Sequence, residues 1–256
     1  MRDEAGAVPS PLMCGVFGSW APLLDSATAV AAANGGRLPE TFTYDLVNLG
    51  REVLAQLSTP ASHHFSLALG ASPLSAASLN STAAAYLDVL ADLDTLLATD
   101  SAFQLGPWIG LARRLAGEAG STDDCTPKGE GVPPELAGCE AFYEWNARVQ
   151  LTSWIPVANR TAVIDPNGPN DYAAKHWNGL VKDFYHQRSL RVHAAALAYA
   201  EAGKPLDAHA IDLLKGRHAY EWQTASKRYP AEPVGDAVEV SKAMLQKHAG
   251  RFASCQ

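Results

Sequence analysis

Apolar residues recur three and four positions apart along most of the chain, which is the spacing of one face of an α-helix. In the first clear case Leu46, Leu49, Val53 and Leu57 share one face of a helix predicted to begin near Thr41. The same spacing predicts helices over 83–99, 103–117, 140–151, 171–202, 208–228 and 235–248. No stretch alternates apolar and polar residues between turn signals. The pattern therefore predicts an all-α fold, a helical bundle-like domain of about seven to nine helices with long irregular loops.

Proline and glycine mark the segments that interrupt these helices. The first forty residues contain Pro9, Pro11, Pro22, Gly35, Gly36 and Pro39. They predict an irregular N-terminal segment, 1–40, with only short helical pieces such as 23–33, followed by one all-helical domain over 41–256. Residues 58–80 and 121–138 are expected to be long surface loops. Asn170 is expected to cap a helix that starts at Asp171.

Charge and hydropathy exclude some classes of partner. The formal net charge of −7, without a basic stripe, argues against a nucleic-acid partner. No run of about 18 apolar residues is present, so no membrane span is expected. The first residues do not combine a basic segment with an apolar one, so no signal peptide is visible. Two interpretations stay open: a cytoplasmic protein, or the internal part of a longer secreted chain.

Cysteines and glycosylation triplets favour the second interpretation. None of the four cysteines belongs to a CxxC pair, which argues against a zinc site. Cys125 and Cys139 bracket a Pro- and Gly-rich stretch that a disulfide between them would close, and whether they pair is left open. Asn80 and Asn159 each begin an Asn-x-Thr triplet, the acceptor sequence for N-glycosylation.

The common sequence signatures of cofactor and metal sites are absent. There is no glycine-rich dinucleotide or phosphate loop, no nucleophile elbow and no paired-histidine zinc motif, so no cofactor is expected. The histidines of the second half of the chain do not combine with a carboxylate at the spacing of metal ligands, so no metal is expected. These are His176, His186, His193, His209 and His218.

Two residue classes bear on sugar chemistry. The carboxylates that could act as a glycosidase pair are Glu140, Glu144, Asp165, Asp171 and Asp183. None lies in an apolar stretch that would raise its pKa, so all are expected on helix surfaces. Aromatic residues are dense between 142 and 185, and most are expected in the core. Trp154 differs, because it follows a helix end next to Pro156, where its ring could stack on a sugar.

Four segments resemble a known family in order and spacing. They are 41–49, 90–108, the Asn-x-Arg-x-Gln-Leu-Thr-x-Trp segment 146–154, and 171–180, which begins Asp-Tyr-Ala-Ala-Lys. Together they resemble the C-terminal region of the α-N-acetylglucosaminidases, glycoside hydrolase family 89, over about 41–248. Tyr185-x-x-Arg188 and Ser226-Lys227-Arg228-Tyr229-Pro230 fit the same family.

The resemblance implies an all-helical domain that packs on a (β/α)₈ barrel, with the sugar pocket between the two. It implies a retaining mechanism by two barrel glutamates, acting on terminal α-linked N-acetylglucosamine as in heparan sulfate, in a lysosomal, vacuolar or secreted enzyme. This chain lacks the barrel and both glutamates, so it is expected to be inactive alone. The alternative is a free-standing helical carbohydrate-binding or protein-interaction module.

The expected site residues are those at which this sequence matches the segments of the family. Trp154 and Tyr172 are expected at the cleft wall as substrate-binding residues, with Arg148, Asp171 and Lys175 as supporting polar residues. One departure matters. Ala174 stands where the family's Asp-Tyr-Ala-Asn-Lys segment has an asparagine.

Overall fold

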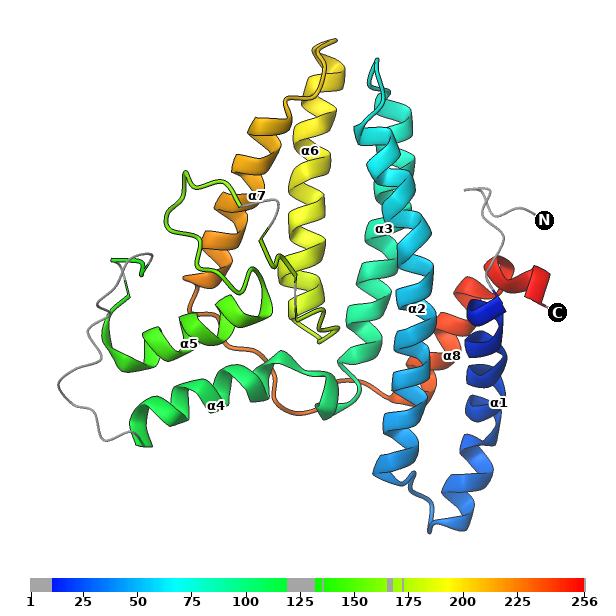
Figure 1. Ribbon diagram of the computed structural model, residues 1–256. Coiled ribbons are helices and arrows are strands. Elements are labelled where there is room, and N and C mark those ends of the chain that lie inside the picture. Colours follow the sequence, from blue (N-terminus) through cyan, green and yellow to red (C-terminus); the bar gives the residue numbers. More distant parts are fainter. Residues whose placement is uncertain (1–10, 119–131, 135, 165–167, 172, 256) are drawn as a thin grey trace.

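A computed structural model describes residues 11–118, 132–134, 136–164, 168–171 and 173–255. Within these ranges the fold is all-α and has no named strand, which confirms the predicted class (Figure 1). The helices are α1 (Pro11–Ala33), α2 (Glu40–Leu69), α3 (Ala76–Leu97), α4 (Leu105–Glu118), α5 (Gly138–Leu151), α6 (Gln187–Glu201), α7 (Ala208–Gln223) and α8 (Ala237–His248). Shorter turns are η1 (Ser101–Phe103), the π-helical η2 (Val181–His186) and η3 (Ala249–Cys255).

The pair α2 and α3 runs through the middle of the molecule. The helices α1 and α8 pack against α2 on one side, and α6 packs against α3 on the other, with α7 beyond it (Figure 1). The pair α4 and α5 lies at the base, below α6 and α7. No helix in the described ranges is long and apolar enough to cross a membrane.

Three apolar clusters form the core. The largest joins α1, α2, α3 and α8 and includes Trp20, Leu54 and Leu93, each no more than 1% exposed. The second joins α4, α5, α7 and η2, and the third joins the far ends of α2 and α3 to α6 and α7. Trp177 and Tyr185 touch both of the first two clusters, so the two halves of the molecule share one continuous apolar interior.

The N-terminal segment is not irregular as predicted, because residues 11–33 form one helix that contains Pro22. Tertiary packing outweighs the proline. The Trp20 ring is fully buried and lies so close to Gly50 of α2 that a Cβ there would be 2.4 Å from it. Burial of one large aromatic side chain contributes roughly 2–3 kcal/mol, comparable to the cost of about 3 kcal/mol for an interior proline.

The prediction of a loop over 58–80 is also wrong. Helix α2 continues past Pro60 to Leu69, and α3 already begins at Ala76. Ala61, Phe65 and Ala68 keep the helical spacing and are buried in the third cluster or next to it. Serine hydroxyls in this stretch donate to carbonyls of the preceding turn, as Ser58 does to Ala55 at 2.7 Å. The Ser- and Pro-rich composition therefore hides a regular apolar face.

The helix predicted to start at Asp171 begins later, at Leu180. Residues before it form turns, and a carboxylate from another helix caps the start. Asp94 of α3 accepts hydrogen bonds from the backbone nitrogens of Gly179 at 2.8 Å and Lys182 at 3.0 Å, and from the Asn178 side chain at 2.8 Å. Such a cap is made by tertiary contact, so the sequence around 171 carries no sign of it.

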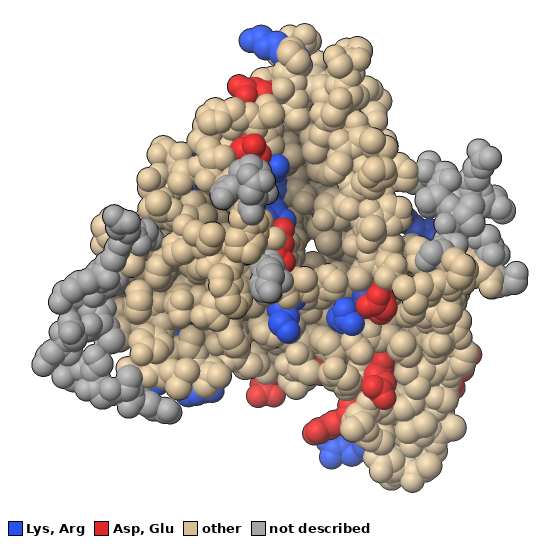
Figure 2. All heavy atoms as spheres, in the orientation of Figure 1, with Lys and Arg blue, Asp and Glu red and all other residues tan. Residues whose placement is uncertain are grey.

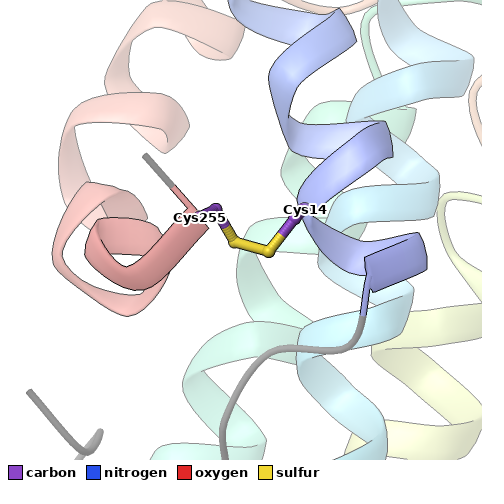
Figure 3. Close-up of a disulfide and its surroundings, with 2 residues drawn as sticks. All are labelled: Cys14 and Cys255. Atoms are coloured by element: carbon purple, nitrogen blue, oxygen red, sulfur yellow. A yellow bond between two sulfur atoms is a disulfide. The ribbon is translucent and has the colours of Figure 1, made fainter.

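One disulfide joins the two ends of the described chain. Cys14 of α1 is bonded to Cys255 of η3, with their Cα atoms 5.1 Å apart and 241 positions between them in sequence (Figure 3). Beside it the Phe17 and Phe252 rings stack with centroids 4.0 Å apart. The bond removes a large part of the unfolded chain's freedom, since the enclosed loop is so long. A bond between Cys125 and Cys139, which the sequence leaves open, involves Cys125, which lies outside the described residues. Most positions of the loop predicted over 121–138 also lie outside them.

His218 of α7 makes the stability of the domain depend on pH. Its ring stacks on Phe184 at 5.3 Å, its Nε2 lies 2.9 Å from the Phe184 carbonyl oxygen, and burial lowers its pKa from 6.5 to about 4. At pH values between about 4 and 6.5 the His218 ring is therefore protonated in the unfolded chain and neutral in the folded domain. The free energy of unfolding is therefore expected to fall as pH drops from 6.5 to 4, by up to about 3 kcal/mol from this group.

Urea denaturation at pH 7.5 and pH 5.0 tests this. The variant His218→Gln, which cannot titrate, should lose less stability between the two pH values than the unaltered chain. Equal losses in both would contradict the assignment. His176 and His186, whose pKa values burial also lowers, act in the same direction in both proteins.

Candidate functional site

The turn that ends α5 presents an exposed tryptophan. Trp154 has a backbone φ of 56°, in the left-handed region, and its nitrogen donates to the Val149 carbonyl at 2.9 Å. This conformation turns the chain sharply after Leu151. The Trp154 and Ile155 side chains are each 53% exposed, an unusual position for two neighbouring large apolar residues.

A buried amide of α7 holds this turn in place. Gln223 is fully buried, and its Nε2 donates to the Thr152 hydroxyl at 2.9 Å and to the Ser153 hydroxyl at 2.8 Å. Its Oε1 accepts from the Val157 nitrogen at 3.2 Å. One side chain thus fixes both ends of the segment that carries Trp154 and Ile155.

A small open pocket lies directly beside the turn. Its volume is about 180 Å³, below the roughly 300–1,000 Å³ typical of sites that enclose a small molecule. One lining residue, Ala162, passes close to α7 at Gly216, where a Cβ would lie 2.0 Å from the Ala162 carbonyl oxygen. The lining residues are Ser153, Ile155, Pro156, Val157, Ala158, Ala162, Val163, Ile164, Gly168 and Asn170. The lining is mostly apolar, and one side is open.

Asp171 and Ala174 also have strained backbones, and Asp171 contacts the first turn. The Asp171 nitrogen donates to the Thr152 carbonyl at 2.6 Å, and its carboxylate accepts two hydrogen bonds from Arg188 of α6, at 3.0 and 2.7 Å. Asp171 and Ala174 have φ values of 55° and 46°. Among the described non-glycine residues, the positive-φ positions are these two and Trp154, so the backbone strain is confined to this one place.

Arg148 lies in the core rather than at the surface. It is fully buried, and its guanidinium donates to Glu144 at 2.7 and 2.9 Å and to the Lys227 carbonyl at 2.9 Å. The other Glu144 oxygen accepts from Arg113 of α4 at 2.7 Å. The Arg148 guanidinium also lies over the Trp222 ring, 4.8 Å from its centroid. Together with Glu144, Arg148 therefore connects α5 to α4 and α7.

Two predicted site residues remain, Lys175 and Tyr172. Lys175 is exposed, with its Nζ 5.5 Å from the centroid of the Trp177 ring. Next to it the His176 Nδ1 lies 3.3 Å from Arg51 of α2. Tyr172 lies outside the described residues. Within the described ranges, no three His, Cys, Asp or Glu side chains gather where they could hold a metal ion.

The candidate carboxylates are engaged in ion pairs. Glu140 and Glu144 pair with Arg113, Asp171 with Arg188 and Asp183 with Lys227, and Asp165 lies outside the described residues. Most of the face in Figure 2 is free of charged atoms, and the acidic and basic groups that lie in its central hollow are close to one another. None of the candidate carboxylates in the described part of the chain lines the pocket.

Two features that shape the site were not predicted. Gln223 and Gly216 both lie on α7, in a segment that was assigned only an apolar face. Gln223 follows the apolar Trp222 at the end of α7. An amide at such a place is the one sign in the sequence of a buried polar contact. Gly216 gives no signal in a single sequence, because a glycine inside a helix has several explanations.

Removing the buried arginine tests its structural role. Arg148→Met is expected to lower the free energy of unfolding by about 3–5 kcal/mol, because Glu144 then keeps a buried charge with only Arg113 to balance it. The matched control is Arg191→Met, whose partner Glu221 lies at the surface, and there the expected loss is below about 1 kcal/mol. Equal losses in chemical denaturation would contradict this assignment.

Ala174 offers a stabilising substitution. A left-handed backbone disfavours alanine by roughly 1–2 kcal/mol, whereas asparagine and glycine tolerate it. Ala174→Asn and Ala174→Gly are therefore expected to raise the free energy of unfolding by about 1 kcal/mol. The control Ala173→Gly, at a position without positive φ, should lower it. A melting temperature that falls in both Ala174 variants would be inconsistent with the strained turn.

Comparison with known proteins identifies the family. Residues 16–247 match the family described as the alpha-N-acetylglucosaminidase C-terminal domain, so the match begins inside α1, earlier than the resemblance over 41–248 implied. Human alpha-N-acetylglucosaminidase is 30% identical over 241 residues, which cover 93% of this chain and 28% of that protein.

Solved structures agree on the fold. A family 89 glycoside hydrolase from Clostridium perfringens in complex with PUGNAc superposes with a TM-score of 0.66 at 18% identity, over 90% of this chain and 23% of that one. A variant from the same bacterium in complex with its substrate GlcNAc-alpha-1,4-galactose gives 0.66 at 17% identity, over 92% and 24%. This chain spans about a quarter of the length of these relatives. The chain therefore belongs to the family of alpha-N-acetylglucosaminidase C-terminal domains.

Proposed function

We propose that this domain forms one wall of a sugar pocket in an enzyme that hydrolyses terminal α-linked N-acetylglucosamine by a retaining mechanism. The remainder of such an enzyme, a barrel by resemblance, supplies the opposite wall and the two catalytic glutamates. The observation that carries the proposal is the exposed Trp154 side chain on a strained turn that Gln223 anchors from below.

A left-handed backbone at a tryptophan and two adjacent exposed apolar side chains both lower the stability of an isolated domain. A binding role explains them, since a sugar ring presents an apolar C–H face that packs on an indole. The adjoining pocket is too small and too open to enclose a sugar by itself, so the site needs a second body.

The carboxylates support the same division of work. Glycoside hydrolysis needs one carboxyl group to protonate the leaving oxygen and a second to attack the sugar or activate water. In the described part of the chain the candidate carboxylates are held in ion pairs, as Glu144 is between two arginines. We therefore assign positioning to this domain and the chemistry to the rest of the enzyme. Trp154 and, by resemblance, Tyr172 contact the sugar, and Asp171 and Lys175 support them.

The substrate and the compartment belong to this proposal. A related bacterial enzyme has GlcNAc-alpha-1,4-galactose as its substrate, which supports an α-linked N-acetylglucosamine at the non-reducing end. The Cys14–Cys255 disulfide supports an oxidising location, such as the secretory route to a lysosome or vacuole, or secretion itself.

The purified chain is expected to release no aryl group from an aryl α-N-acetylglucosaminide, because the proposal assigns both carboxylates of the reaction to the rest of the enzyme. The assay follows absorbance of the released phenolate over hours at pH 5 and pH 7. Turnover that survives repurification and disappears in Glu140→Gln would contradict the division of work proposed here.

Calorimetric titration with N-acetylglucosamine separates the proposal from a free-standing binding module. Half a pocket should bind the sugar too weakly to measure, because most of the contact area is missing. Micromolar binding that Trp154→Ala abolishes would favour the module instead. Leu67→Ala is the matched control, because Leu67 is 58% exposed on α2, in another part of the chain.

A further inference from the structure

The turn that follows the pocket rim displays an N-glycosylation triplet on the surface. Asn159, Arg160 and Thr161 are all exposed. The Asn159 side-chain oxygen accepts hydrogen bonds from both the backbone nitrogen and the hydroxyl of Thr161, each at 2.8 Å. The two side chains that define the triplet therefore face one another in a compact turn, outside any helix.

The other triplet is arranged differently. Asn80 lies inside α3, where the Thr82 hydroxyl donates to the Ser78 carbonyl at 2.7 Å instead of to the asparagine. The Asn80 side-chain oxygen lies 2.9 Å from Nε2 of His193 on α6, so the amide takes part in a contact between two helices. A modifying enzyme would have to unwind the first turns of α3 to bring the asparagine and the threonine together.

An independent observation places the chain where such a modification occurs. The Cys14–Cys255 bond forms in an oxidising compartment, and in eukaryotes the same compartment holds the machinery that attaches glycans to asparagine. The disulfide is independent of the proposed sugar pocket.

We propose that Asn159 is an N-glycan acceptor and that Asn80 is not. The donor is a lipid-linked oligosaccharide pyrophosphate. The bond between the first sugar carbon and the pyrophosphate oxygen breaks, and a bond from that carbon to Nδ2 of Asn159 forms. One Nδ2 proton is lost, and the lipid pyrophosphate leaves. A glycan at Asn159 extends into solvent from the loop that lines the pocket through Val157, Ala158 and Ala162.

Translation of the full chain behind a signal peptide, in the presence of microsomes, tests the proposal. A known acceptor sequence appended after Gln256 shows that each chain has entered the lumen. The unaltered chain should gain one endoglycosidase-sensitive glycan besides that of the appended sequence. The glycan should be absent from Thr161→Ala and Asn159→Gln and present in Thr82→Ala.

Mass spectrometry after enzymatic deglycosylation locates the modified residue, because release of the glycan converts its asparagine to aspartate. Conversion at 159 alone supports the proposal. Chains that carry only the appended glycan, or that lose the second glycan in Thr82→Ala, would overturn it. Comparison of gels with and without reductant reports separately whether the disulfide has formed.

Discussion

The buried ion pair between Arg148 and Glu144 is the interaction that ties α5 to α4 and to the end of α7. Its guanidinium and carboxylate lie inside the second apolar cluster, where an unpaired charge would be costly, and each finds additional partners there. Those partners come from α4, α7 and the segment after α7. The orientation of α5, and with it the direction in which the chain leaves Leu151, follows from satisfying these charges.

The strained turns after α5 are stable because they are held from several sides. Trp154 and Asp171 adopt left-handed conformations that an isolated peptide would avoid, and Gln223 and Arg188 bind the segments in which they lie. Each of these anchors comes from a helix of the second half of the chain. Rigid support under an exposed ring is what a binding surface requires, since a mobile side chain would lose entropy when it contacts a ligand.

Periodic apolar spacing predicted the fold class and most helices, because burial of one face leaves a direct trace in the sequence. It failed where tertiary contacts override local signals. Pro22 and Pro60 both lie inside helices that continue past them, because buried residues before and after each proline hold the helix in place. The helix near Leu180 begins where Asp94 of α3 accepts a hydrogen bond from the Gly179 nitrogen. The exposure of Trp154 could be predicted from its place next to Pro156. Gln223 could not, because its partners are backbone and hydroxyl groups about 70 positions away.

The link between Cys14 and Cys255 also has a mechanical consequence. Tension applied to polypeptide attached at the two ends passes through the covalent bridge, because the bonded residues enclose nearly all of the helices. The enclosed chain cannot lengthen while the bridge is intact, so the helices and the loop that carries Trp154 are shielded from the load. Movement between this domain and a neighbour fused to it would thus leave the exposed indole ring in its place.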